Sequence, residues 1–359
     1  MRIVRHLYPG SNTSRGFFSY YDQILPSAKA RRIFVLKGGP GVGKSTLMRR
    51  AGALLEPLFD VEYLHCSSDP DSLDGICAPA LGFLMLDGTS PHVVDPLVPG
   101  AVDGIVNLGV CLNEDAMQVQ APRILRLQAD ISRCFARAYR YLSAASSVRS
   151  DSAALLEQAT DRARLDALLR PALQALFAES PRFAAGQERK MFAGAITPKG
   201  CIHTLDTLGA AQVWQIQGPW GIPSQWALER IRTQLLWQGQ TVESYFCALD
   251  PTRLEHLYFP ANGLLITTDS LHHSYAEHTA RVLDWQECLD ASLLSAHAER
   301  LDLNHQLFET LLDAAVSCLE QAKRLHDQLE AIYIQYMDYQ ALDAMSESVL
   351  NRIRSLMQR

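Results

Sequence analysis

Residues 33–47, IFVLKGGPGVGKSTL, place the strongest constraint on how this chain folds. An apolar run rich in β-branched and aromatic residues comes first, a glycine-rich turn follows, and Lys-Ser-Thr then opens a segment with helical composition. The stretch fits G-x-x-x-x-G-K-[ST], with Gly38, Gly43, Lys44 and Ser45 at the fixed positions. It therefore predicts a strand, a tight loop and a helix, in that order.

These residue types suit the binding of phosphate. Glycines allow successive N–H groups to point inward, and the following helix adds partial positive charge at its N-terminus. We expect Lys44 to stabilise charge on the phosphates of ATP and the Ser45 hydroxyl to bind Mg²⁺. The residues expected to surround the nucleotide are Gly38, Gly39, Pro40, Gly41, Val42, Gly43, Lys44, Ser45 and Thr46. No guanine-specifying N-K-x-D motif is present, which favours adenine.

Such a loop needs a second anionic group for the metal, usually an Asp at the end of a neighbouring apolar strand. Asp87 follows the apolar run Phe83–Leu86 and is the candidate that we prefer. Asp69, in HCSSDPDSLDG, is a candidate for a catalytic base that orients water or substrate. The alternative for Asp69-Pro70 is a turn or a helix cap, because such pairs commonly form them.

A second copy of the same pattern follows in the sequence. LKGGPGVGKST from Leu36 aligns without a gap with IQGPWGIPSQW from Ile216. Downstream, HCSSDPDSLDGICAPALGFLMLD from His65 aligns with FCALDPTRLEHLYFPANGLLITT from Phe246. Upstream, RHLYPGSNTSRG from Arg5 aligns with RKMFAGAITPKG from Arg189. The length and number of these matches predict duplication of a whole domain.

The second copy lacks the residues that bind phosphate. Pro223, Ser224 and Gln225 stand where the first copy has Gly43, Lys44 and Ser45, and Thr268 aligns with Asp87. Proline removes an N–H group from the loop, and the missing lysine removes its fixed positive charge. We therefore expect weak or no binding of nucleotide phosphates at the second copy.

Both copies keep the Cys-x-x-Asp-Pro element, which favours a structural role for Asp69 and Asp250. Residues present only in the first copy are the better functional candidates. Besides Lys44, Ser45 and Asp87, they include His65, Ser67 and Ser68.

Each core precedes a mainly helical segment with apolar residues at helical spacing, over about 121–177 and from 291 to 357. The expected architecture is α/β, with two tandem P-loop NTPase-like domains, each a mainly parallel sheet flanked by helices, and long helical extensions. The expected boundaries are 1–185 for the intact copy and 186–359 for the degenerate one. The helices are expected to pack in the chain, with self-association to a homo-oligomer as the alternative.

A basic residue precedes a glycine near the start of each copy, Arg15 in the first and Lys199 in the second. If the halves pack with pseudo-twofold symmetry, Lys199 or Arg189 could complete the site at Lys44 as a basic finger. The alternative is a solvated charge on a hairpin.

The composition narrows the classes of partner. The formal net charge is −6, which argues against general nucleic-acid binding and against an anionic membrane surface. We find no apolar run of signal-peptide or membrane-helix length, and the eight cysteines contain no C-x-x-C pair. The expected location is the cytoplasm, with reduced thiols.

The motifs LKGGPGVGKST, HCSSDPDSLDG and FAGAITPKG resemble those of an uncharacterised bacterial family of tandem P-loop ATPase-like proteins. The likeness covers roughly residues 1–115 and 186–285. It implies nucleotide binding and a tandem architecture, but it supplies no substrate. Members of that family tend to have an intact second loop where this chain has GPWGIPSQ.

The leading expectation is ATP binding with Mg²⁺-dependent hydrolysis at the first domain, with Lys44, Asp87 and Asp69 as the catalytic candidates and Ser45 with Asp87 as metal ligands. One alternative is a small-molecule kinase whose acceptor pocket is lined by residues 65–75. The other is a nucleotide-gated interaction module whose helices report the bound state to a protein partner.

Overall fold

The chain divides into two compact units, and each unit takes segments from both halves of the sequence. Unit 1 consists of residues 1–9, 21–137 and 317–359, and unit 2 consists of residues 10–20 and 138–316. The structure, a computed structural model, describes residues 2–90, 93–176, 185–269, 272, 274–275 and 277–358.

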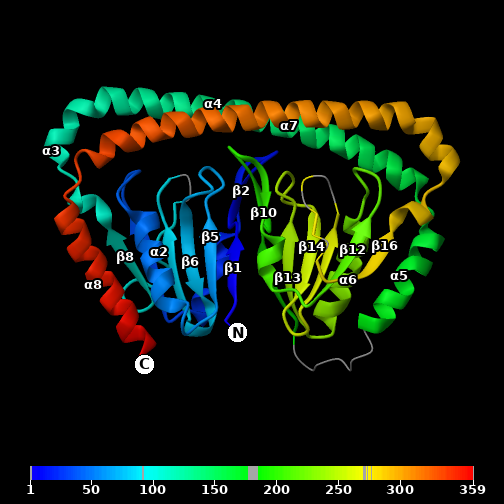
Figure 1. Ribbon diagram of the computed structural model, residues 1–359, viewed down its shortest axis with the longest axis horizontal. Coiled ribbons are helices and arrows are strands. Elements are labelled where there is room, and N and C mark those ends of the chain that lie inside the picture. The colour runs from blue at the N-terminus through cyan, green and yellow to red at the C-terminus, as the bar shows by residue number, and fades with distance from the viewer. Residues whose placement is uncertain are drawn as a thin grey trace. The chain divides into compact units, whose positions relative to one another are not determined.

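Unit 1 is built on a six-stranded sheet in the order β1-β5-β6-β7-β4-β8 (Figure 1). The strands are β1 Val4–Leu7, β4 Arg32–Lys37, β5 Val61–His65, β6 Leu73–Ala78, β7 Phe83–Asp87 and β8 Asp103–Asn107. β6 is antiparallel to both of its neighbours, and the other pairs are parallel. The predicted α/β class with mainly parallel strands is confirmed for this unit.

Helices cover the unit 1 sheet and bury β4, the strand that precedes the predicted phosphate loop. β4 is buried from Ile33 to Leu36, which explains its unbroken apolar run, because a parallel strand with both faces covered has no polar side. α2 (Lys44–Leu55) buries its apolar face against the sheet, and α8 (Tyr339–Met357) adds Val349 and Ile353 to the same core.

Unit 2 repeats this arrangement, with the strand order β16-β12-β15-β14-β13-β9. The strands are β9 Gln187–Met191, β12 Gln212–Gln217, β13 Thr241–Phe246, β14 Leu254–Phe259, β15 Leu264–Thr268 and β16 Thr279–Asp284, and α6 spans Gln225–Trp237. β14 is the antiparallel strand. Leu36 pairs with Asp87 in unit 1, and Ile216 pairs with Thr268 in unit 2. The same order, direction and register in both sheets are those expected of a duplicated domain.

The hairpin near the start of the chain belongs to unit 2. It consists of β2 (Gly10–Thr13) and β3 (Gly16–Ser19), and it lies beside the hairpin of β10 (Gly194–Thr197) and β11 (Gly200–His203). The Asn12 Nδ2 donates a hydrogen bond to the Ile196 carbonyl at 2.9 Å, and the Ser14 N–H donates to the Leu249 carbonyl at 2.8 Å.

The long helices are also shared between the units. α4 (Ala121–Ala159) and α7 (Ala291–Ile334) each contribute one end to each unit, α5 (Arg162–Leu176) belongs to unit 2, and α8 belongs to unit 1. Within unit 1, α4 and α7 meet through Ile124, Leu127, Leu329 and Ile332. The shorter helices are α1 Tyr21–Ile24, η1 Ser27–Lys29, η2 Pro79–Leu81, η3 Leu108–Cys111, α3 Glu114–Met117, η4 Gln118–Gln120, η5 Leu205–Leu208 and η6 Trp285–Cys288.

The compact units therefore differ from the expected continuous domains 1–185 and 186–359. Residues 10–20 and 138–176 pack in the unit built on the second core, and residues 317–359 pack in the unit built on the first. We call these three ranges the exchanged segments. The apolar periodicity of a helix fixes which face is buried, but it does not fix which of two similar cores the helix covers.

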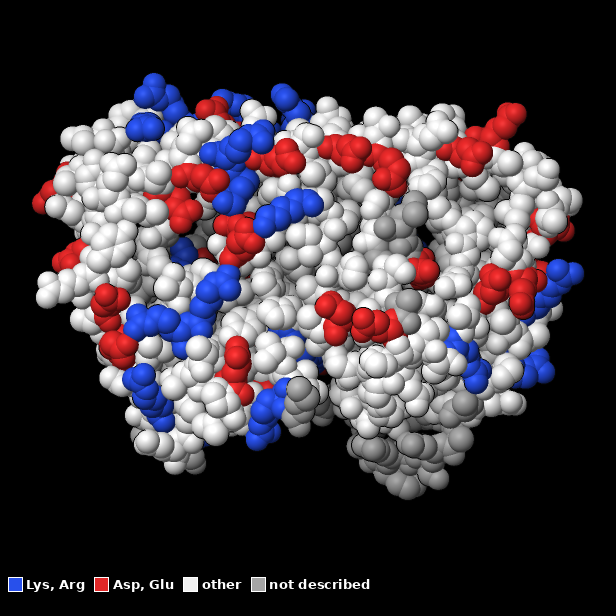
Figure 2. All heavy atoms as spheres, in the orientation of Figure 1, with Lys and Arg blue, Asp and Glu red and all other residues white. Residues whose placement is uncertain are grey.

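On the face shown in Figure 2, Lys and Arg side chains are interspersed with Asp and Glu. None of the helices in the described part of the chain combines the length and apolar character needed to cross a membrane.

Candidate functional site

In unit 1, the predicted phosphate loop joins the end of β4 to the start of α2. Gly38, Gly41 and Gly43 have φ values of 145°, 71° and 83°, in the region that disfavours residues with a Cβ atom. No side chain caps the N-terminus of α2, so its first N–H groups are available to an anion.

Lys44 lies inside this loop. Its Nζ donates hydrogen bonds to the carbonyl oxygens of Gly38 at 2.7 Å and Gly39 at 2.9 Å. The same atom is 3.5 Å from the Asp87 Oδ2, and the two side chains are only 12% and 14% exposed. The structure thus brings together the two residues that the sequence analysis placed at the centre of the site.

Asp87 is held in a fixed orientation at the end of β7. Its Oδ1 accepts hydrogen bonds from the Thr89 N–H at 2.9 Å and from the Thr89 hydroxyl at 2.6 Å, while its Oδ2 faces Lys44. The Ser45 hydroxyl accepts a hydrogen bond from the Leu73 N–H at 3.1 Å. This hydrogen bond links Ser45, in the first turn of α2, to the start of β6.

Asp69 forms a turn at the end of β5. Its Oδ2 accepts a hydrogen bond from the Ser72 hydroxyl at 2.9 Å, and its carbonyl accepts one from the Ser72 N–H at 2.8 Å. Lys323 of α7 lies 3.5 Å from the same Oδ2. These contacts are those of a turn cap, the role favoured by comparing the two copies, and a catalytic role for Asp69 stays a prediction.

The C-terminal end of α7 packs directly on the phosphate loop, which the sequence analysis did not foresee. A Cβ atom at Gly39 would lie 2.3 Å from the Tyr333 ring, and one at Gly41 would lie 2.9 Å from Glu330 and from Ile334. Gly39 is therefore required by this packing. The only signal in the sequence was the apolar stripe of the helix, and such a stripe does not specify which part of the protein the helix packs against.

The other first-copy candidates lie around the Asp69 turn. His65 is hydrogen-bonded to His6, with 2.8 Å between Nε2 and Nδ1, and its own Nδ1 is 3.1 Å from the Pro70 carbonyl. Burial, and to a lesser extent the neighbouring His6, hold the pKa of His65 below its usual value. Ser67 is buried, and Ser68 is half-buried.

The three basic-finger candidates all lie in unit 2. Arg189 is 3.6 Å from Glu243 within the sheet, and Lys199 is exposed at the turn of the β10–β11 hairpin. Arg15 donates a hydrogen bond to the Thr252 hydroxyl at 3.4 Å and is 3.9 Å from Asp250. Arg15, from the first copy, thus contacts the Asp-Pro turn of the second, and the finger at Lys44 stays a hypothesis.

The corresponding loop of unit 2 has replaced its ion pair with two hydroxyls. Ser224, at the position of Lys44, is fully buried, and its hydroxyl accepts a 2.9 Å hydrogen bond from the hydroxyl of Thr268, at the position of Asp87. Gly221 keeps a positive φ of 90°, as Gly41 does, but Pro223 cannot adopt the positive φ of Gly43. Unit 2 therefore keeps the turn but lacks the charged groups that unit 1 has at these positions.

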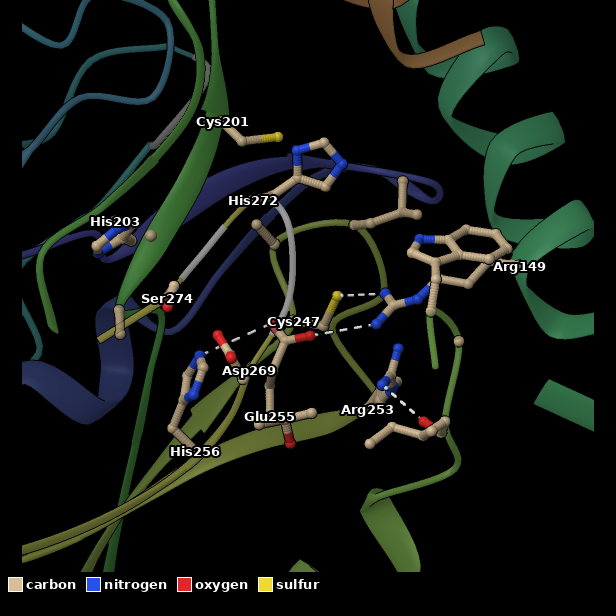
Figure 3. A pocket seen from close by; sticks show the side chains of 18 of the residues that line it. Arg149, Cys201, His203, Cys247, Arg253, Glu255, His256, Asp269, His272 and Ser274 are labelled. Carbon is tan, nitrogen blue, oxygen red and sulfur yellow. Dashed lines mark hydrogen bonds and ion pairs between the residues drawn. The ribbon is translucent and has the colours of Figure 1, made fainter. Parts of the chain in front are cut away.

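A cavity of about 930 Å³ opens beside this degenerate loop, within unit 2. Its walls come from β10, β11, residues 217–222, the ends of β13 and β15, β14, and the unit 2 parts of α4 and α7. Arg149 of α4 donates hydrogen bonds to the Cys247 sulfur at 3.0 Å and to Glu255 at 3.2 Å (Figure 3). The sequence analysis missed Arg149 because α4 was assigned to the other copy.

Several other polar groups line the cavity (Figure 3). The His256 Nε2 lies 3.9 Å from the Glu255 Oε2, and Arg253 donates to the Ile222 carbonyl at 3.2 Å. The His256 Nδ1 lies 2.8 Å from the Thr267 hydroxyl. Burial raises the pKa of the Cys201 thiol to about 12, so this thiol is protonated near neutral pH.

No family model matches this chain, and neither the curated proteins nor the solved structures contain a protein that matches it.

Proposed function

We propose that unit 1 belongs to the P-loop NTPase class and that it binds ATP and hydrolyses it with Mg²⁺. The observation that carries this proposal is the half-buried Lys44–Asp87 pair, 3.5 Å apart. Asp87 ends β7, which is parallel to the neighbouring β4, and Lys44 follows a loop rich in positive-φ glycines. Lysine for phosphate and aspartate for a metal are the two charges that such a reaction needs.

The groups present fit a bound nucleotide with Mg²⁺. Lys44 is held by two loop carbonyls and Asp87, which are contacts that it can exchange for phosphate oxygens without leaving the loop. Asp87 has one oxygen occupied by Thr89 and the other directed at Lys44, and the Ser45 hydroxyl carries lone pairs for a hard cation. Ser45 and Asp87 would hold Mg²⁺, which neutralises charge on the phosphates when bound.

Each residue then has a defined task. The N–H groups of the loop and of the first turn of α2 bind phosphate oxygens, and Lys44 holds the terminal phosphates in position. Thr89 keeps Asp87 in one orientation. The low exposure of Lys44 and Asp87 strengthens their interaction with charge that develops during phosphoryl transfer.

The test is calorimetric binding of ATP with Mg²⁺ to the wild type, to Lys44→Ala and to Lys29→Ala, a control at an exposed lysine of unit 1. A hydrogen bond to a charged group contributes about 1.5–3 kcal/mol. We therefore expect Lys44→Ala to weaken binding roughly 10- to 100-fold and to abolish ADP release, with Lys29→Ala unchanged. Equal affinity of Lys44→Ala and wild type would contradict the assignment, and a stoichiometry of two would contradict our interpretation of the second loop.

A second candidate, a nucleotide-gated interaction module, is supported by the contact between α7 and the loop. Tyr333 and Glu330 lie against Gly39 and Gly41, so a change in loop conformation reaches this helix directly. Tight ATP binding with almost no turnover would favour this candidate over the ATPase. ADP formation that requires an added metabolite would instead favour a kinase.

A further inference from the structure

The cavity of unit 2 has the size of a ligand site, and the proposed ATPase reaction does not use it. At about 930 Å³ it falls at the upper end of the range for small-molecule pockets, which is roughly 300–1,000 Å³. It adjoins Gln217–Ile222, the loop that corresponds to the phosphate loop of unit 1. A ligand site here would be a second site of different chemistry.

The charges that line the cavity do not favour phosphate. Its lining residues include two cations, Arg149 and Arg253, against three carboxylates, Glu255, Asp269 and Asp284. Arg149 is already bound by Glu255 and Cys247. At the position of Lys44 stands the buried, hydrogen-bonded Ser224. Arg253 donates to the Ile222 carbonyl, and the carboxylates of the lining outnumber its two arginines, so an anionic ligand would lose hydration without gaining a net positive charge.

Asp269 lines the cavity and is a candidate hydrogen-bond acceptor for a ligand. Its Oδ1 is enclosed and has no hydrogen-bond partner among the described residues, although its main-chain N–H donates to the Ile216 carbonyl at 2.9 Å. Asp269 as a whole is half-buried and lines the cavity, and its ionised carboxylate has lone pairs for further donors, so the part of the side chain that faces the cavity can accept a hydrogen bond from an N–H group of a ligand. Asp269 and His256 both line the cavity (Figure 3).

Aromatic rings form another wall. The Trp220 ring stacks on His305, with centroids 4.8 Å apart and planes at 14°, and lies 5.0 Å from the Phe308 ring. Flat faces of this kind bind planar rings, and a tryptophan face also attracts a cation.

We infer that this cavity binds a phosphate-free small molecule that is neutral or cationic, with a planar ring and an N–H donor. The ring lies against Trp220 and Phe308, and the donor hydrogen-bonds to Asp269. The inference does not depend on ATP hydrolysis at unit 1.

The test uses two probes, adenosine as the neutral ring compound and tryptamine as the cationic one. Each is titrated calorimetrically into the full chain and into Asp269→Asn, Trp220→Ala and Lys44→Ala. Controls are Asp313→Asn, at an exposed position of α7 in unit 2, and Trp237→Ala, at a tryptophan that is 83% exposed. Asp269→Asn keeps the shape of the side chain, so it remains informative if Trp220→Ala fails to fold.

We expect at least one probe to bind with a stoichiometry of one. Asp269→Asn should weaken that binding about tenfold, the effect of losing one hydrogen bond to a charged group, and Trp220→Ala should weaken it as well. Lys44→Ala and both controls should bind as the wild type does. The inference is overturned if neither probe binds, if Asp269→Asn binds equally well, or if ATP displaces the probe from Lys44→Ala. Loss of ATP binding in Asp269→Asn, with Lys44 intact, would also contradict the inference, because it would show that the cavity and the ATP site are not separate sites.

Discussion

At the scale of single residues, the two units show which groups distinguish the proposed nucleotide site of unit 1 from the corresponding loop of unit 2. Lys44 and Asp87 form an ion pair at 3.5 Å, and Ser224 and Thr268, at the corresponding positions, form a hydroxyl pair at 2.9 Å. Both pairs link the start of a helix to the end of a strand. The charges are therefore dispensable for this packing, and unit 1 keeps them for another reason.

A double-mutant cycle in unit 2 tests this equivalence. Ser224→Lys alone places a charge at a fully buried position, which should destabilise the protein by about 3–5 kcal/mol, as an unpaired buried charge does. Adding Thr268→Asp should recover part of that loss by restoring the pair seen in unit 1. Urea unfolding of the two single variants and the double variant measures the coupling free energy. Strictly additive effects would show that the positions are not equivalent.

The burial of His65, beside His6, makes the stability of unit 1 depend on pH. Burial lowers the pKa of His65, so the unfolded chain binds a proton more readily than the folded one. Stability is then complete above the unfolded pKa of about 6.5 and falls as the pH decreases below it. We expect the urea midpoint of the wild type to fall between pH 7 and pH 5.5, and to fall less in His65→Gln. An equal decrease in both proteins would show that other groups account for the effect.

At the scale of elements, the packing of α7 constrains the predicted phosphate loop in addition to the residues of its motif. The Tyr333 ring fills the space that a Cβ atom at Gly39 would need. A Cβ atom at Gly43 would lie 3.1 Å from the Leu342 side chain of α8. Motif chemistry accounts for Gly38, Gly43, Lys44 and Ser45. It does not account for Gly39, which lies in the variable part of the pattern and is explained only by the packing of α7.

This packing predicts a specific rescue. Gly39→Ala should destabilise unit 1 by about 1–3 kcal/mol, because the added methyl group overlaps the Tyr333 ring. Tyr333→Ala in the same chain should remove the overlap and restore ATP binding, at the cost of some helix packing. Thermal unfolding and ATP calorimetry on the single and double variants are the measurements. If Gly39→Ala alone behaves like the wild type, the contact is not a constraint.

At the scale of the whole molecule, the exchanged segments make each unit depend on residues from both halves of the sequence. Val349, Leu350 and Ile353 of α8, from the end of the chain, are buried in the core of unit 1. The hairpin at residues 10–20, from its beginning, is hydrogen-bonded in unit 2 through Asn12 and Ser14. Each unit therefore needs both halves to complete its core.

Separate expression of the halves tests this dependence. Fragment 1–185 lacks α8 and the end of α7, so we expect it to expose the sheet core and to aggregate when expressed alone. Co-expression with fragment 186–359 should give a soluble complex that co-purifies at one-to-one stoichiometry and binds ATP. Size-exclusion chromatography and calorimetry are the measurements. A soluble fragment 1–185 that unfolds cooperatively and binds ATP would contradict the exchange.

The sequence by itself determined the elements and the duplication. The apolar run at Ile33–Leu36 predicted a buried strand, the glycine-rich motif predicted the loop, and the apolar spacing predicted the helices, because these signals are local. It also selected Lys44 and Asp87 for one site, and the structure brings them within 3.5 Å of each other. The aligned copies revealed the loss of charge at Ser224.

Only the tertiary structure decided which helix covers which core. Two duplicated cores present similar apolar surfaces, so the pattern of a helix cannot distinguish them, and the pairing depends on the path of the whole chain. That pairing brings Tyr333 to Gly39 and Arg149 to Glu255. It therefore created the two features that no local signal contained: the helix against the phosphate loop, and the cavity of unit 2.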